Sequence, residues 1–127
     1  ILDKYPALKI AFAHGGGAFP FAIGRIDHGF HVRPDLCAID NEKLPSSYLK
    51  HFYLDSLVHD VKAMAYLIDT LGENQIAMGS DYPFPLGEHH PGKLIESMEL
   101  ADSTKQRLLA GTALEWLGLD EGEFTIN

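Results

Sequence analysis

The sequence predicts a parallel α/β fold, and three observations support this class. Short apolar runs, typical of strands buried on both faces, alternate three times with segments of helical periodicity. Each run ends in polar and turn-forming residues. Three strands make a poor independent sheet, because two of them are unpaired edges. Residues 1–127 are therefore interpreted as a single partial domain, the C-terminal part of a larger sheet or barrel.

The first predicted strand covers residues 9–13 and is closed by His14. The three glycines that follow allow a tight turn and a close approach of a ligand to the main chain. Pro20 is suited to the start of the helix predicted over residues 21–32, and Pro34 ends that helix.

A polar, irregular connection over residues 33–47 leads to the second predicted strand, at residues 52–56. Asp60 is placed to cap the next helix. That helix is predicted over residues 61–71, where apolar residues recur at helical spacing, and Gly72 is its natural stop.

The third predicted strand covers residues 75–78, and Asp81 arrives just after its apolar run ends. Two prolines, Pro83 and Pro85, prevent continuation as a strand or a regular helix. An acid at the carboxyl end of a buried strand lies where parallel α/β folds carry their chemistry. A turn or helix-cap role is the structural alternative for Asp81.

The C-terminal third is predicted to be helical. Helices over residues 94–100 and 102–109 precede a last helix over residues 113–117, which Gly118 ends. The acidic segment 121–127 is predicted to be a frayed tail.

The composition excludes several classes of partner. A formal net charge of −8 argues against nucleic acid and anionic membranes. No apolar run approaches the roughly 20 residues that span a bilayer. The N-terminus lacks the basic region and apolar core of a signal peptide, and a single cysteine, Cys37, suits a reducing compartment. A cytoplasmic protein is expected.

Polar residues follow all three predicted strands. His14, His59 and Asp81 would therefore converge on one rim of a parallel barrel. Imidazole and carboxylate groups there are natural ligands for zinc or another divalent metal, or an acid/base pair beside one. The alternatives are that His14 only hydrogen-bonds its turn and that His59 only precedes a helix cap.

Further polar and aromatic residues have two interpretations each. Arg25, one turn into the first helix, either holds a carboxylate as a bidentate fork or is a solvated charge, and the same holds for Arg33. Tyr82 and Phe84 either line a substrate pocket or pack their loop. The pair at 89–90 is favoured as solvated loop histidines, because adjacent residues rarely face one ion.

Six segments together resemble one known family. They cover residues 12–21, 24–26, 33–37, 57–60, 79–87 and 91–98. They are similar to the C-terminal part of the metal-dependent decarboxylase branch of the amidohydrolase superfamily, from Tyr5 to about Leu119. The resemblance implies a (β/α)8 TIM-like barrel of which this chain supplies about the last three βα units.

The resemblance also implies roles for four residues. Asp81 matches the aspartate that ligates a zinc ion after the last strand, and His14 matches a catalytic histidine that acts as general acid/base. Arg25 matches an arginine that binds a substrate carboxylate in the neighbouring subunit's site, which implies a homodimer. Phe84 matches a position that lines the substrate pocket, and His59 matches no assigned role.

The activity implied is zinc-dependent, non-oxidative decarboxylation of a small anionic dicarboxylate from tryptophan or related aromatic catabolism, without an organic cofactor. The family completes its metal site with a His-x-His pair and a further histidine, and neither motif is present here. The chain alone is therefore expected to be inactive. A metal-dependent hydrolase or hydratase of the same superfamily, and a non-catalytic fragment, remain alternatives.

Overall fold

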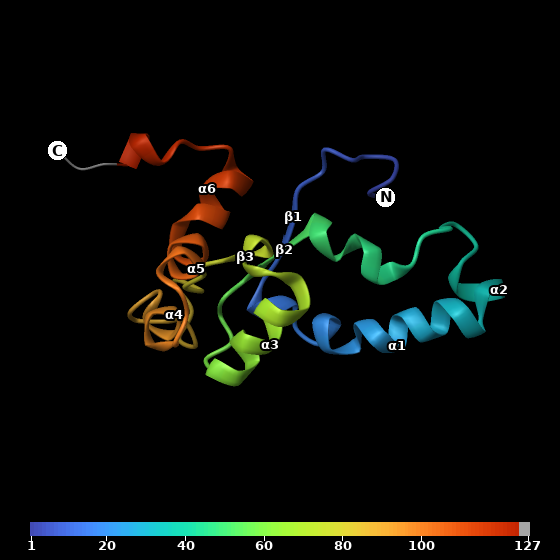
Figure 1. Ribbon diagram of the computed structural model, residues 1–127, viewed down its shortest axis with the longest axis horizontal. Coiled ribbons are helices and arrows are strands. Elements are labelled where there is room, and N and C mark those ends of the chain that lie inside the picture. The colour runs from blue at the N-terminus through green and yellow to red at the C-terminus, as the bar shows by residue number, and fades with distance from the viewer. Residues whose placement is uncertain (125–127) are drawn as a thin grey trace.

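A computed structural model describes residues 1–124 and places a parallel sheet at the centre of the molecule, with helices around it (Figure 1). The strands are β1 (Ile10–Phe12), β2 (Phe52–Asp55) and β3 (Ile76–Ala77), in the order β1-β2-β3. The predicted α/β class with a parallel sheet is confirmed.

The register aligns the carboxyl ends of the strands. Phe12 lies opposite Leu54, Leu54 opposite Ile76, and Asp55 opposite Ala77. The segments that follow the strands therefore leave from one edge of the sheet. Each strand is shorter than predicted, and Gln75 belongs to a 3₁₀ turn over Glu73–Gln75.

The first strand is less covered than its apolar run predicts. Ile10 is partly buried, Ala11 is exposed, and Phe12 is 45% exposed. Within residues 1–124, β1 pairs only with β2, so its other edge has no neighbouring strand. The prediction of burial on both faces is wrong for β1 in this chain, because burial there needs a further strand and its helix.

Helix α1 (Phe19–Val32) extends away from the sheet toward the short α2 (Pro34–Cys37) (Figure 1). It begins before the predicted residue, with Pro20 in its first turn, where a missing amide hydrogen costs nothing. A 3₁₀ segment, Pro45–His51, packs alongside α1 and leads into β2.

Helix α3 (Val61–Leu71) has the predicted bounds. Asp60 caps it as predicted, since its carboxylate accepts a hydrogen bond from Ala63 N at 2.8 Å. Its buried side chains pack on the sheet in a core formed by Leu54, Met64, Leu67, Ile76, Ile95, Met98 and Leu108.

The C-terminal helices differ from the prediction in length. Helix α4 (Lys93–Ser97) ends early because Met98 is extended, with ψ at 148°. Helix α5 (Asp102–Gln106) continues through a π-helical turn into α6 (Thr112–Leu117), which ends at Gly118 with φ at 72°. The segment predicted to fray holds a 3₁₀ turn, Glu121–Phe124, and residues 125–127 lie outside the described residues.

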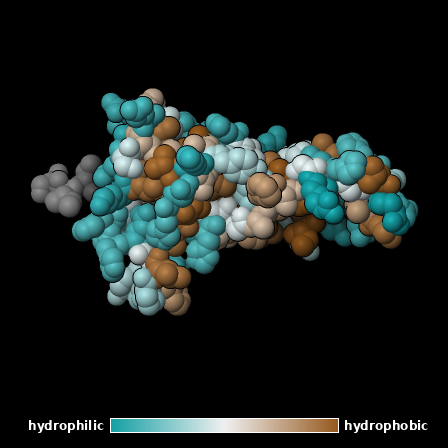
Figure 2. All heavy atoms as spheres, turned by 90° about the horizontal axis from the view of Figure 1, so that it is seen from below, coloured by the Kyte–Doolittle hydropathy of each residue, from teal (hydrophilic) through white to brown (hydrophobic). Residues whose placement is uncertain are grey.

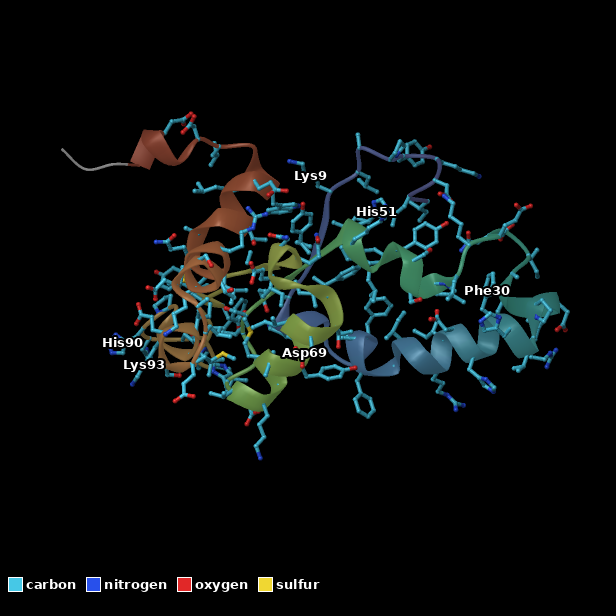
Figure 3. All side chains as sticks on the ribbon, in the orientation of Figure 1. Lys9, Phe30, His51, Asp69, His90 and Lys93 are labelled. Carbon is cyan, nitrogen blue, oxygen red and sulfur yellow. The ribbon has the colours of Figure 1, made fainter. Side chains whose placement is uncertain are left out.

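Helix α6 closes one side of the sheet. The Trp116 ring lies 6.3 Å from that of Tyr53, and the Lys9 ammonium donates to the carbonyls of Glu115 and Trp116 (Figure 3). A cavity of about 330 Å³ lies between these strands and α6. Its walls include the small side chains Ala11 and Ala77, on the face opposite the Leu54 core.

Large apolar side chains lie on the surface, and Figure 2 shows apolar areas among hydrophilic ones on the face viewed from below. They include Phe21 on α1 and Tyr82, Phe84 and Leu86 in the loop after β3. Within residues 1–124, none of the helices combines the length and apolarity required to cross a bilayer.

Candidate active site

The residues that follow the three strands share an unusual backbone conformation. Among residues 1–124, the non-glycine residues with positive φ are His14 at 57°, His59 at 53° and Asp81 at 55°. A non-glycine residue in this left-handed region costs about 1–2 kcal/mol. Such conformations persist only where the surroundings enforce them, and they gather at functional sites.

Two of these residues meet. His14 Nε2 lies 3.5 Å from Asp81 Oδ1, although 67 positions separate them in the sequence. The imidazole is 62% exposed and the carboxylate 21% exposed, so the pair opens to solvent at the edge of the sheet. The structure therefore brings together the two residues predicted for acid/base and metal chemistry; their roles stay predictions.

The glycine turn after His14 is explained by close packing. A Cβ on Gly15 would lie 2.5 Å from Val58 Cγ1, and one on Gly16 would lie 2.8 Å from Leu54 Cδ2. Both glycines also have positive φ. Glycine at these two positions allows the turn to pack closely against the end of β2, with the His14 imidazole at the edge of the sheet.

The turn around Asp81 is built by other groups than its carboxylate. Asp81 O accepts from Phe84 N at 2.8 Å, and Ser80 O accepts from Glu88 N at 2.9 Å. Ser80 Oγ accepts from Tyr82 N at 3.3 Å. Because the backbone and Ser80 form the turn, the Asp81 carboxylate is left to face His14.

His59 has a different contact from the one predicted. Its Nε2 lies 2.8 Å from Leu86 O, so the imidazole holds the loop after β3 instead of joining the His14–Asp81 pair. The ring also borders a pocket of about 320 Å³ whose wall includes His90 and Lys93, which Figure 3 shows at α4. Of the three residues predicted to converge, His14 and Asp81 lie together and His59 does not join them.

Sequence reasoning missed Asp55 and Ser56. Asp55 Oδ1 accepts from Gly15 N at 2.9 Å, and Ser56 Oγ accepts from Gly79 N at 3.2 Å. The available signal was a polar pair ending an aromatic strand, between two strands whose ends carry the candidate site.

The remaining predicted residues lie apart on the surface. Arg25 is exposed on α1, and Phe84 is 65% exposed in the loop after β3. Arg33 forms an exposed ion pair with Asp35, in which the guanidinium donates to both carboxylate oxygens, at 2.9 and 2.7 Å. This bond lowers the pKa of the Asp35 carboxyl.

The donor chemistry of the His14–Asp81 pair fits a divalent metal, since carboxylate oxygen and imidazole nitrogen are ordinary ligands of such ions. No group of three or more His, Cys, Asp or Glu side chains in the described part of the chain is arranged to hold an ion. Within residues 1–124, the candidate ligands that the structure brings together are therefore the two side chains of this pair.

The family model described as amidohydrolase matches residues 1–119. The chain belongs to the amidohydrolase family. Its match begins near the N-terminus and includes all three strands, His14 and Asp81. The family resemblance predicted from six sequence segments is confirmed.

Curated relatives are decarboxylases by name. The chain is 54% identical over 98% of its length to 2-amino-3-carboxymuconate-6-semialdehyde decarboxylase of Dictyostelium discoideum, covering 35% of that protein. It is 45% identical over 95% of its length to the Caenorhabditis elegans protein of the same name, covering 30% of it. The chain thus spans about a third of the length of these relatives.

Solved structures share the fold. 5-Carboxyvanillate decarboxylase from Sphingomonas paucimobilis superposes with a TM-score of 0.82 at 24% identity, over 94% of this chain and 36% of that one. A dihydroxybenzoic acid decarboxylase from Polaromonas sp. JS666, with bound manganese, gives 0.77 at 23%, over 98% and 38%. The three βα units of this amidohydrolase chain are accordingly part of a TIM-type barrel.

Proposed function

We propose that the full-length protein is a metal-dependent decarboxylase that converts 2-amino-3-carboxymuconate 6-semialdehyde to 2-aminomuconate 6-semialdehyde and carbon dioxide. The observation that carries this proposal is the His14–Asp81 pair, 3.5 Å apart at the ends of β1 and β3. The 54% identity to a decarboxylase of this name supports the substrate. The proposed setting is cytoplasmic tryptophan or related aromatic catabolism, without nucleic-acid or membrane partners.

The proposed metal is zinc, with Asp81 as one ligand and the others outside the described residues. The manganese bound to the Polaromonas enzyme supports a divalent ion in general. When bound, such an ion supplies Lewis-acid polarisation and lowers the pKa of coordinated water. The partly buried Asp81 carboxylate is suited to this role, because the backbone and not its side chain forms the surrounding turn.

His14 is the proposed general acid/base. Decarboxylation breaks the bond to one carboxylate carbon, releases carbon dioxide and places a proton on the carbon left behind. His14 Nε2 faces the Asp81 carboxylate, and its exposed ring can exchange protons with solvent between turnovers. Its turn holds the ring in place while the proton moves.

Arg25 is proposed to bind a substrate carboxylate in the site of the neighbouring subunit of a homodimer. Its guanidinium is exposed on a helix that extends away from the sheet (Figure 1). In a protein with a net charge of −8, an anionic substrate needs local cations. Phe84, exposed beyond Asp81, is proposed to line the pocket.

The first experiment measures loss of substrate absorbance and release of carbon dioxide by the zinc-loaded, full-length protein. Asp81→Asn and His14→Gln are each expected to lower kcat by at least about 100-fold. Lys62→Gln, on the exposed side of α3, is the matched surface control and should leave turnover unchanged. Consumption of substrate without carbon dioxide would favour the hydrolase or hydratase alternative.

The subunit proposal is tested by mixing two inactive variants. In dimers of Arg25→Ala with Asp81→Asn, one of the two sites has an intact metal ligand and an intact arginine from its partner. Random mixing should therefore restore about a quarter of wild-type activity. Recovery of none would place Arg25 in its own subunit's site, and an active Arg25→Ala protein would place Arg25 outside the site.

A further inference from the structure

One dipeptide, Asp55-Ser56 at the end of the middle strand β2, contacts the turns on both sides. Asp55 Oδ1 accepts a hydrogen bond from Gly15 N at 2.9 Å and another from Leu57 N at 3.1 Å. Gly15 directly follows His14. The carboxylate of one strand end thereby fixes the backbone from which the imidazole of the neighbouring strand end projects.

The second residue of the dipeptide binds the opposite turn. Ser56 is 2% exposed, and its Oγ accepts from Gly79 N at 3.2 Å, two residues before Asp81. A Cβ on Gly79 would lie 2.8 Å from Asp55 Cβ, so the Asp55 side chain also lies directly against this backbone. Both candidate site turns are thus held from β2.

The two turns need such support, because His14 and Asp81 have positive φ. Resting on the proposed decarboxylase function, we propose that Asp55 and Ser56 are positioning residues that keep His14 Nε2 beside Asp81 Oδ1. They act through the backbone, not by contact with substrate. The distance between acid/base group and metal ligand is then set by the middle strand.

The chemistry of the two hydrogen bonds suggests a conservative variant. Asp55 acts as an acceptor for two backbone amides through a single oxygen. An asparagine side-chain oxygen can accept the same two bonds, with weaker electrostatic attraction. Asp55→Asn should therefore preserve the positioning, whereas Asp55→Ala removes it.

The kinetic test uses the full-length zinc-loaded enzyme. Asp55→Ala is expected to lower kcat by at least about 10-fold, because small displacements of reacting groups cost up to about 100-fold. KM should stay within about twofold, since substrate-binding groups are untouched. Asp55→Asn should recover kcat to within about threefold of wild type.

Ser56→Ala provides a second, milder variant, with Thr112→Val as its matched control. Thr112 is also buried, and its hydroxyl donates to Glu73 O at 3.0 Å, in a hydrogen bond between α6 and the segment before β3. Both variants should lower the melting temperature. Only Ser56→Ala should lower kcat per folded enzyme, by about threefold or more.

A crystal structure of the Asp55→Ala protein keeps this test separate from the substrate assignment. A lengthened or disordered His14–Asp81 contact is expected, and an unchanged 3.5 Å separation would overturn the positioning role. If Asp55→Ala does not fold, the Ser56→Ala structure and kinetics decide. Wild-type enzyme without decarboxylation overturns the proposed function, while the coordinates still test the positioning role.

Discussion

At the scale of single residues, Gly15 combines a backbone and a packing constraint. Its φ is 59°, and a Cβ would lie 2.5 Å from Val58 Cγ1. We expect Gly15→Ala to destabilise the full-length protein by about 2–4 kcal/mol, from left-handed strain and overpacking together. Urea unfolding followed by circular dichroism measures this change.

Two other glycines separate these contributions. Gly118 lies in the same left-handed region, with φ at 72° and ψ at 33°, but a Cβ there would meet nothing within 4 Å, so Gly118→Ala should cost only the conformational part, about 1–2 kcal/mol. Gly24, within α1, has neither constraint, and Gly24→Ala should stabilise by about 0.5–1 kcal/mol. Equal losses at Gly15 and Gly118 would contradict the packing explanation.

The Asp3 carboxyl gives a pH prediction. Hydrogen bonds from Lys43 and Tyr48 lower the pKa of Asp3, so its stabilising contribution is present above the ordinary carboxyl pKa and is lost as pH falls through the lowered value. Lys43→Met should raise the pKa of Asp3, while the bond from Tyr48 keeps part of the effect. NMR titration of the carboxyl carbon measures it, with Lys62→Met as the control.

The sequence predicts some residues of the candidate site and not others, for physical reasons. His14 and Asp81 can be identified because a strand's end is visible as the point where an apolar run stops. The contact of His59 with Leu86 O depends on the path of an irregular loop, which periodicity does not encode. The role of Asp55 cannot be predicted from the sequence pattern, because its partners are backbone amides, which every residue except proline has.

At the scale of elements, Asp60 makes a separable contribution to α3. Asp60→Ala should destabilise by about 1 kcal/mol, because the Ala63 amide loses its acceptor. Asp69→Ala is the matched control near the other end of the same helix, where removal of a negative charge is neutral or slightly stabilising. Denaturant midpoints of the two variants compare them directly, and equal midpoints would contradict the capping role.

Element types are better predicted than element ends. The observed bounds of helix α3 match the prediction, because a cap, an apolar stripe and a terminal glycine agree along it. Helix α4 and β3 are shorter than predicted, since apolar residues such as Met98 and Met78 continue beyond the last regular turn or ladder pair. Hydrophobicity there serves core packing instead of secondary structure.

At the scale of the whole molecule, the sequence of β1 is suited to more burial than the rest of this chain provides. Its continuous apolar run fits a strand inside a closed barrel, yet Phe12 is 45% exposed. The alanine-lined cavity under α6 likewise has strands on one side only. Both features fit a larger amidohydrolase barrel, because the chain spans about a third of the length of its relatives.

The proposed metal site gives a prediction for the isolated 127 residues, because no group of three or more candidate ligands is arranged to hold an ion within residues 1–124. Their zinc affinity should be more than about 100-fold weaker than that of the full-length protein, since even outer-shell losses cost about 10–100-fold. Competition with a chromophoric chelator measures both affinities, and Asp81→Asn in the full-length protein is the companion variant. Tight, stoichiometric zinc in the short chain would overturn this expectation.

The left-handed backbone at the three strand ends restricts which amino acids are tolerated at these positions. Apart from glycine, asparagine, aspartate and histidine tolerate this conformation best, while β-branched and bulky residues do not. Aspartate and histidine are also metal ligands and proton carriers. At His14, His59 and Asp81, the backbone conformation therefore disfavours most apolar side chains, independently of any requirement for activity. A new reaction on this scaffold would be reached more readily by exchanges among these few residues than by a free search of all twenty.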